Sequence, residues 1–565
     1  MTQEANINTQ QRDWWAQGDT PARANDSLVT YLVDGRQAMW TICRHCIKAQ
    51  KYIYLANWGM TAKMELVRGD DYLGGPDGSP QRTALIEGLR AEDFSEADIQ
   101  FWLTHNLSVQ AVLGYARSKG VEVKVLLWHS QEAFSHYQPL ETKQELEAVG
   151  VHCILDDSAR GLVHHPVESL HQKTAVIDGT HAFVGGVDLL IEKQGDYDRW
   201  DTPMHAFNTP LRLNEQQKTP HPWHDVHSLI EGCAAGDVEL NFRQRWNDVV
   251  ARQRLDTSFT IPERPLPSPV QGAQTVQVVR TIPQHTYDFD PDPGLQDIAQ
   301  VYAKALGNIQ RFAYLENQYL WLRTFIGVDL PLMGSDSPDM ETNLRTLGAA
   351  LQRGAFASII LPDHPNVGRA FSDAGLQRLH TEAPRAFEEG RFEAFCLGSS
   401  GQIDGKTHYR PIYVHAKVAI IDDLWSTVGS ANLNNRGMRD DTEINVAVLD
   451  SRLARNLRLL LQGEHLGLVQ DADLFVLSRL LGRQRLSASE QERAVYIHDY
   501  LEERLGEPRA ALQAMHECAW NNLQRYKENQ PLIGHLLPYL SAAEAANQGL
   551  NFREEHGWLE EEAQK

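Results

Sequence analysis

The sequence predicts an α/β fold that is built twice, as two layered halves related by a pseudo-two-fold axis. Three segments of the first half recur in the second half in the same order: residues 38–58 and 296–318, 108–128 and 347–363, and 169–189 and 413–433. The first two pairs pass from apolar residues at helical spacing into a short apolar run, so helices alternate with strands. This alternation is typical of α/β domains, and 565 residues exceed what one hydrophobic core usually serves.

The repeat also suggests how the chain is divided. We expect an N-terminal extension at 1–36, a first lobe at 37–255, a proline-rich connection at 256–294, a second lobe at 295–467 and a helical C-terminal region at 468–565. Seven prolines between residues 261 and 294 resist regular structure, and we expect a short strand at 275–280 among them.

Each half contains one copy of a His-x-Lys-x4-Asp motif. The copies are His171, Lys173 and Asp178 in the first half, and His415, Lys417 and Asp422 in the second. On a strand, side chains two residues apart share a face, so the histidine and lysine of each copy point the same way. The aspartates follow at an odd offset, and Asp178-Gly179 favours a hairpin turn, so we interpret both aspartates as structural.

Further polar residues lie at matching offsets behind the motifs. The strand that returns from each turn carries Asp188 in the first half, and Ser430 and Asn432 in the second. Asn317 belongs to the repeated Tyr-Leu-x-Asn segment. We predict that these four side chains support a bound phosphate.

The residue types fit the cleavage of a phosphodiester. One neutral imidazole attacks phosphorus to form a phosphohistidine, while the other, protonated, gives its proton to the departing alcohol and then activates water. The lysines place positive charge on the phosphate, so we expect no metal ion and no cofactor. Each imidazole needs an acceptor on its other nitrogen, and Asp225 and Glu443 are the candidates.

Composition limits the partners. A net charge of −22 argues against binding along a nucleic-acid backbone. Residues 1–20 lack an apolar run and no segment has the roughly 18 apolar residues that span a bilayer, so we expect synthesis in the cytoplasm and any export by a signal-independent route. Six scattered cysteines predict no disulfide framework, and Cys43 and Cys46 share a helix face, which indicates core packing.

Other residues leave two interpretations open. The aromatic segments 197–207 and 319–321 either rim a lipid pocket or pack in the core. Four histidines are expected in loops or on the surface and are left out of the site: His164, His165, His205 and His221.

Several stretches resemble the phospholipase D superfamily, in its plant and animal branch with bacterial relatives. They are HQKTAVID with FVGGVDL, PWHDVHSLIEG, YLENQYL, and YVHAKVAIID with VGSANLNNRGMRDDTEINVAV, within residues 37–467. The resemblance implies two α/β/α sandwich lobes with the active site at their interface. It also implies hydrolysis of a glycerophospholipid at a membrane surface to phosphatidic acid and a free head group, with transfer to alcohols as a side activity. His171 would be the nucleophile and His415 the acid and base.

One departure from that branch is informative. Only 36 residues precede the similar region, where plant and animal members carry calcium- or phosphoinositide-binding modules. The chain therefore looks like bacterial members, some of which are type VI secretion effectors, for which an immunity protein would be a partner. The alternatives are a nuclease or other phosphodiesterase of the superfamily, a cardiolipin-synthase-like phosphatidyltransferase and a non-catalytic binding module.

Overall fold

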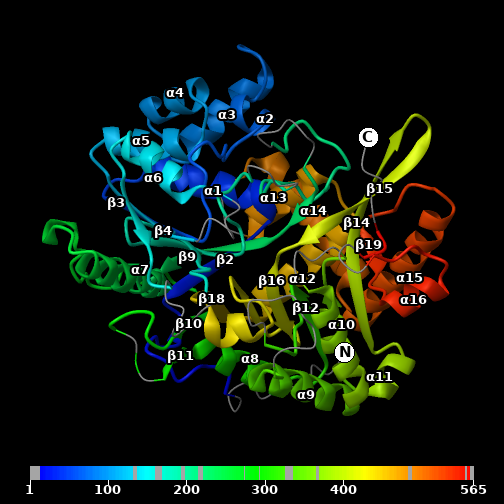
Figure 1. Ribbon diagram of the computed structural model, residues 1–565. Coiled ribbons are helices and arrows are strands. Elements are labelled where there is room, and N and C mark those ends of the chain that lie inside the picture. The colour runs from blue at the N-terminus through cyan, green and yellow to red at the C-terminus, as the bar shows by residue number, and fades with distance from the viewer. Residues whose placement is uncertain are drawn as a thin grey trace.

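The computed structural model describes residues 13–130, 137–159, 168–192, 197–213, 220–272, 274–289, 291, 293–324, 335–363, 368–481, 486–553 and 557–559. Within these ranges the strands form two sheets, and helices cover them (Figure 1). The predicted α/β class with two lobes is confirmed.

The first sheet has seven strands among the described residues. In spatial order they are β2 (Ser27–Val33), β9 (Val226–Gly232), β7 (His181–Gly185), β6 (Lys173–Ile177), β3 (Tyr52–Asn57), β4 (Glu122–Trp128) and β5 (His152–Asp156).

The second sheet has twelve strands among the described residues. Its main path is β1 (Arg23–Ala24), β10 (Thr275–Pro283), β18 (Glu443–Leu449), β17 (Trp425–Gly429), β16 (Lys417–Ile421), β12 (Phe312–Asn317), β13 (Phe356–Ile360), β14 (Phe392–Ile403), β15 (Lys406–Val414) and β8 (Trp223–His224). Two further strands join it at the side: β11 (Gly294–Gln296) pairs with β10, and β19 (Leu536–Pro538) pairs with β14.

The internal repeat is visible in the strand order. The run β2-β9-β7-β6-β3-β4-β5 corresponds strand by strand to β10-β18-β17-β16-β12-β13-β14. In both runs the first four pairings are antiparallel and the last two are parallel. Strand β4 is buried on both faces between its end residues, which explains why residues 123 to 127 are apolar apart from Lys124.

The helices follow the same division. Those of the first half are α1 (Asp34–Lys48), α2 (Asp70–Leu73), α3 (Pro80–Ala91), α4 (Glu96–Thr104), α5 (Val109–Ser118), α6 (Pro139–Glu147) and α7 (Cys233–Arg252). Those of the second half are α8 (Asp297–Gly307), α9 (Pro338–Gln352), α10 (Arg369–Glu382), α11 (Pro384–Glu388) and α12 (Ser451–His465). The C-terminal helices are α13 (Asp471–Leu481), α14 (Ala488–Leu505), α15 (Pro508–Lys527) and α16 (Ala542–Asn547). The described residues also contain a 3-10 turn at Thr257–Phe259 and a π-helical turn at Arg436–Asp440.

Several strands come from segments outside the two expected lobes or join the sheet of the other half. The N-terminal extension supplies β1 to the second sheet and β2 to the first. The connection supplies β10, which extends the expected short strand and takes the place that β2 has in the other sheet. The C-terminal region, expected to be helical, also contributes β19. Strand β8, from the first half, pairs with β15 of the second sheet.

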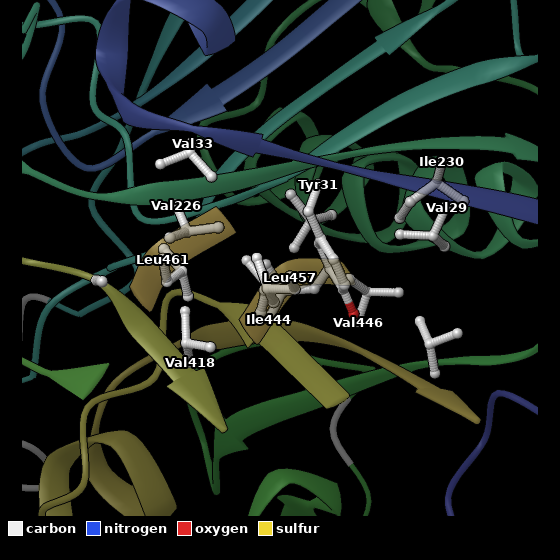
Figure 2. Close-up of a cluster of buried hydrophobic side chains, with 14 of the residues drawn as sticks. Val29, Tyr31, Val33, Val226, Ile230, Val418, Ile444, Val446, Leu457 and Leu461 are labelled. Atoms are coloured by element: carbon white, nitrogen blue, oxygen red, sulfur yellow. The ribbon is translucent and has the colours of Figure 1, made fainter. Parts of the chain in front are cut away.

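The two sheets share one hydrophobic core (Figure 2). Val29 and Tyr31 of β2 and Ile230 of β9 face Ile444 and Val446 of β18. Within this core the hydroxyl group of Tyr31 lies 2.8 Å from the Ser426 hydroxyl group, a polar contact between the halves. The buried contact between the sheets holds the two motifs at one interface.

Two further expectations concern the fold. Cys43 and Cys46 of α1 are buried and not disulfide-bonded, as core cysteines should be. In the part of the chain that the structure describes, no helix combines the length and the apolar character needed to cross a bilayer.

Candidate active site

The two motif histidines lie side by side at the contact between the halves. His171 precedes β6, and His415 lies between β15 and β16. Their ring centroids are 6.4 Å apart. The side chains are 12% and 8% exposed, so both rings are nearly enclosed yet not sealed off.

Each histidine is held by the opposite half. The backbone N–H of His171 donates to Thr442 O at 2.9 Å, and its Nδ1 lies 2.9 Å from Glu443 Oε1. The backbone N–H of His415 donates to His224 O at 2.8 Å, and its Nδ1 lies 2.7 Å from Asp225 Oδ2. With Nδ1 of each ring facing a carboxylate, Nε2 is the nitrogen left for chemistry.

The two lysines have different surroundings. Lys173 Nζ lies 3.4 Å from Asp188 Oδ2, and it donates to His171 O at 2.8 Å. Lys417 Nζ donates to Gln318 Oε1 at 3.2 Å and to the backbone carbonyl of His415. The first ammonium group thus has a carboxylate beside it, whereas the second is held by amide and carbonyl oxygens.

The predicted supporting residues lie around this pair. Ser430 donates its hydroxyl proton to Glu443, and its carbonyl oxygen lies 3.1 Å from His171 Nδ1. Asn317 Oδ1 accepts from Leu433 N, in the loop after β17, at 3.0 Å and from Tyr319 N at 3.2 Å. The buried Asn432 Oδ1 and Asn317 Nδ2 have no hydrogen-bond partner among the described residues.

The motif aspartates lie in turns away from the histidines. Asp178 accepts from the backbone N–H groups of Gln50, Lys51 and Tyr52 at 2.9, 2.7 and 3.0 Å. Both aspartates have positive φ, 54° for Asp178 and 57° for Asp422.

Asp422 makes the equivalent bonds in the second half. It accepts from Gln310, Arg311 and Phe312 at 2.9, 2.8 and 2.8 Å. In each half the aspartate ties the turn to the start of the central strand, a contact that suits a structural role.

Burial controls the protonation of the site. Burial, followed by Lys173 and Lys417, lowers the pKa of His171 well below its usual range. Burial, followed by the same two lysines, also lowers the pKa of His415. Burial raises the pKa of Glu443 and of Asp225, against the attraction of Lys417 for both. Two neutral imidazoles are therefore favoured until an anion enters and offsets the lysine charge.

Aromatic rings surround the histidines. Trp58 is in edge contact with His171 at 6.1 Å between centroids, and Trp223 lies 4.9 Å from His415. Of the two open interpretations of segment 197–207, core packing describes Trp200, which is 1% exposed beside Arg68. Tyr197 instead packs on Trp223 and lies beside the site.

The second segment, 319–321, is divided in the same way. Trp321 is buried at 3% exposure, whereas Tyr319 is half-buried.

Some residues near the site were not identified from the sequence. Arg199 stacks over Trp223 at 4.2 Å and pairs with Glu192 at 2.7 Å. Gln318 holds Lys417. The position of Gln318 directly after Asn317, at the end of a repeated strand, is the signal that could have identified it.

The histidines that were left out have different positions. His205 lies in a loop, as expected, but not at the surface: its side chain is fully buried against three carboxylates. His221 is half-buried, and His164 and His165 lie outside the described residues.

Comparison with known proteins places the chain in a family. Residues 103–327 match the family model described as Phospholipase D, and residues 329–462 match the one described as Cardiolipin synthase, PLD-like domain. The chain belongs to the phospholipase D superfamily. Each of these two matches covers one motif copy.

Full-length relatives are similar at low identity. Phospholipase D alpha 2 of Oryza sativa subsp. japonica is 25% identical over 543 residues, covering 75% of this chain and 62% of that protein. Phospholipase D1 of Schizosaccharomyces pombe is 23% identical over 537 residues, covering 80% of this chain and 36% of that protein. The chain thus spans less than two thirds of the length of either relative. A solved phosphatidylserine synthase from Haemophilus influenzae aligns over 91% of this chain and 98% of its own at 14% identity, with a TM-score of 0.44.

Proposed function

We propose that this protein is a phospholipase D, which hydrolyses the distal phosphodiester of glycerophospholipids to phosphatidic acid and a free head group. The observation that carries the proposal is the pair of imidazoles 6.4 Å apart, each steadied at Nδ1 by a carboxylate of the other half. That separation suits one phosphorus atom between them, about 3 Å from the attacking nitrogen, with a hydrogen bond of about 2.8 Å from the other ring to the leaving oxygen.

In the first step, neutral His171 Nε2 attacks phosphorus, and the bond from phosphorus to the head-group oxygen breaks. His415, protonated at Nε2, gives its proton to that oxygen. The positive charge that forms on the His171 ring is balanced by Glu443, which lies 2.9 Å from Nδ1. Lys173 and Lys417 offset the charge of the non-bridging phosphate oxygens.

In the second step, His415 is neutral and accepts a proton from water. The water oxygen attacks phosphorus, and the bond from phosphorus to His171 breaks, which releases phosphatidic acid and restores both rings. A primary alcohol in place of water gives the transfer product. Because burial and the two lysines lower the pKa of both histidines, the acid proton is best held once the phosphate anion has offset the lysine charge.

A lipid substrate fits the chain better than a nucleic acid. The net charge of −22 disfavours a polyanion, and the relatives with which it aligns are named phospholipases D. The substrate would be reached at a membrane surface. Export by a signal-independent route and an immunity-protein partner stay predictions from the sequence.

The test measures products with purified protein. Vesicles of phosphatidylcholine or phosphatidylethanolamine, with and without a primary alcohol, should yield the free head group with phosphatidic acid or the phosphatidyl alcohol, followed by mass spectrometry. The double variant His171→Ala, His415→Ala should yield none. Plasmid DNA is incubated in parallel: DNA cutting without head-group release would favour a nuclease, and exchange between lipids without hydrolysis would favour a phosphatidyltransferase.

A further inference from the structure

A second cluster of titratable side chains lies behind the active site. It consists of Asp34 at the start of α1, His205, His224 of β8 and Glu464 of α12, and we refer to these four residues as the buried cluster. All four are at most 2% exposed. They come from four separate segments of both halves, and the mechanism above does not use them.

The donor atoms of the buried cluster have the spacing of a tetrahedral metal site. Glu464 Oε1 lies 3.0 Å from His205 Nε2 and 3.1 Å from His224 Nδ1. Asp34 Oδ1 lies 3.0 Å from His224 Nδ1, and Asp34 Oδ2 lies 3.6 Å from His205 Nε2. Ligands about 2.0–2.1 Å from a tetrahedral zinc ion are about 3.3 Å from one another, so one ion fits between these atoms.

The second nitrogen of each histidine is held as metal-binding histidines are held. His205 Nδ1 lies 3.3 Å from Asp201 Oδ2, and His224 Nε2 lies 2.8 Å from Glu316 Oε2. A carboxylate on the outer nitrogen fixes the tautomer that leaves the inner nitrogen as a ligand.

Asp34 supplies an independent observation that points to a cation. Its Oδ1 accepts the backbone N–H of Asp225 at 3.2 Å. Its Oδ2, in a residue that is 0% exposed, has no hydrogen-bond partner among the described residues and faces His205. The residue also holds a φ of 61°, which few side chains adopt.

Protons alone account less well for this arrangement. The single N–H at His224 Nδ1 faces two carboxylates, Asp34 and Glu464, at 3.0 and 3.1 Å. One proton cannot point at both, whereas a divalent cation between the donor atoms contacts both carboxylates and both imidazoles.

We propose that the buried cluster binds one divalent transition-metal ion, with Asp34, His205, His224 and Glu464 as ligands. Two imidazoles with two carboxylates at tetrahedral spacing suit zinc first. The ion is structural, because the ligands are sealed from solvent and belong to segments of both halves.

A single residue, Asp225, connects the buried cluster to the catalytic His415. Asp34 Oδ1 holds the backbone of Asp225, whose carboxylate holds His415, and the carbonyl oxygen of His224 accepts from the backbone of His415. A bound ion would therefore keep Asp225 and His415 in place.

The experiment uses the full chain without a histidine tag. After incubation with zinc and dialysis, elemental analysis should find about one zinc ion per chain. Removal by a strong chelator should lower the midpoint of thermal unfolding, and zinc should restore it. Cobalt in place of zinc should give the visible absorption of a tetrahedral site.

Variants assign the ion to its ligands. His205→Gln and Glu464→Gln should lose the ion, whereas the control His45→Gln, at a half-buried histidine of α1 outside the buried cluster, should keep it. The double variant His171→Ala, His415→Ala should keep it too. Zinc below about a tenth of an ion per wild-type chain with no cobalt spectrum, or an ion that disappears only with the catalytic pair, would overturn the proposal. The wild-type measurement decides the question even where a ligand variant fails to fold.

Discussion

The two halves of the molecule share a strand order and a motif, but they surround their histidines differently. In the second half, Ser430 donates a hydrogen bond to Glu443, the carboxylate that holds His171. The equivalent position in the first half is Gly186, where a Cβ would lie 2.0 Å from Asp225 Oδ1. The shorter Asp225 side chain thus takes the space that the serine has in the other copy.

The charges differ as well. Lys173 has Asp188 beside it, whereas the position equivalent to Asp188 in the second half is the neutral Asn432. The two halves therefore share their strand order but differ in the charges beside their lysines. A site built from two copies of one strand arrangement can therefore give its two histidines unequal tasks, which is what a mechanism with one nucleophile and one acid requires.

Removing either histidine has the largest expected effect. His171→Ala and His415→Ala should each lower the rate of head-group release at least about 10³-fold, because the reaction needs both the nucleophile and the acid. A phosphodiester lipid with a nitrophenolate leaving group separates them, since that leaving group needs no proton. His415→Ala should release about one nitrophenolate per chain and then stop with the phosphatidyl group on His171, whereas His171→Ala should release none.

The matched control for this comparison is His152→Ala, a half-buried histidine of β5 away from the site, which should turn over as the wild type does. A burst in His171→Ala and none in His415→Ala would exchange the two roles. Substantial turnover in both variants would contradict a shared site.

Neutral replacements of the two carboxylates should have the next largest effect. Asp225→Asn and Glu443→Gln keep the shape but lose the charge that fixes the tautomer, and we expect kcat to fall about 100-fold or more. With the nitrophenolate substrate, Glu443→Gln should slow the burst, and Asp225→Asn should slow only the steps after it. Glu147→Gln, at an exposed residue of α6, is the control. Equal slowing of the burst by both variants would show that the halves act alike.

The sequence predicted part of this arrangement and not the rest. The division into two α/β halves follows from the internal repeat. The crossed pairing does not, because Asp225 reaches His415 through the pairing of β8 with β15, between residues far apart in the chain. The burial of His205 was not predicted, because a histidine in an irregular polar loop has no periodic pattern to indicate burial.

The difference in charge between the halves should appear in the pH profile. Burial, with the repulsion of Lys173, lowers the pKa of Lys417 to about 7 against the attraction of Asp225. A lysine is charged below its pKa, so Lys417 loses the positive charge that attracts the phosphate as the pH rises. We therefore expect kcat/KM to fall by up to about tenfold per pH unit above pH 7. Asn432→Asp, which copies the first half, should raise this pKa and move the basic limb to higher pH. Gln81→Glu, an exposed change in α3, should leave the limb in place, and a limb unmoved by Asn432→Asp would remove Lys417 as its cause.

The two turn aspartates should affect stability and leave catalysis almost unchanged. Asp178→Ala and Asp422→Ala each lose three backbone hydrogen bonds and place alanine at positive φ, so the free energy of unfolding should fall by about 2–3 kcal/mol. The loss should be larger for Asp422, which is 4% exposed, than for the half-buried Asp178. Asparagine tolerates positive φ, so the Asn variants should lose less. Denaturant unfolding measures the loss, and turnover per folded molecule should stay at the wild-type level; if turnover fell while stability did not, the aspartates would belong to the chemistry.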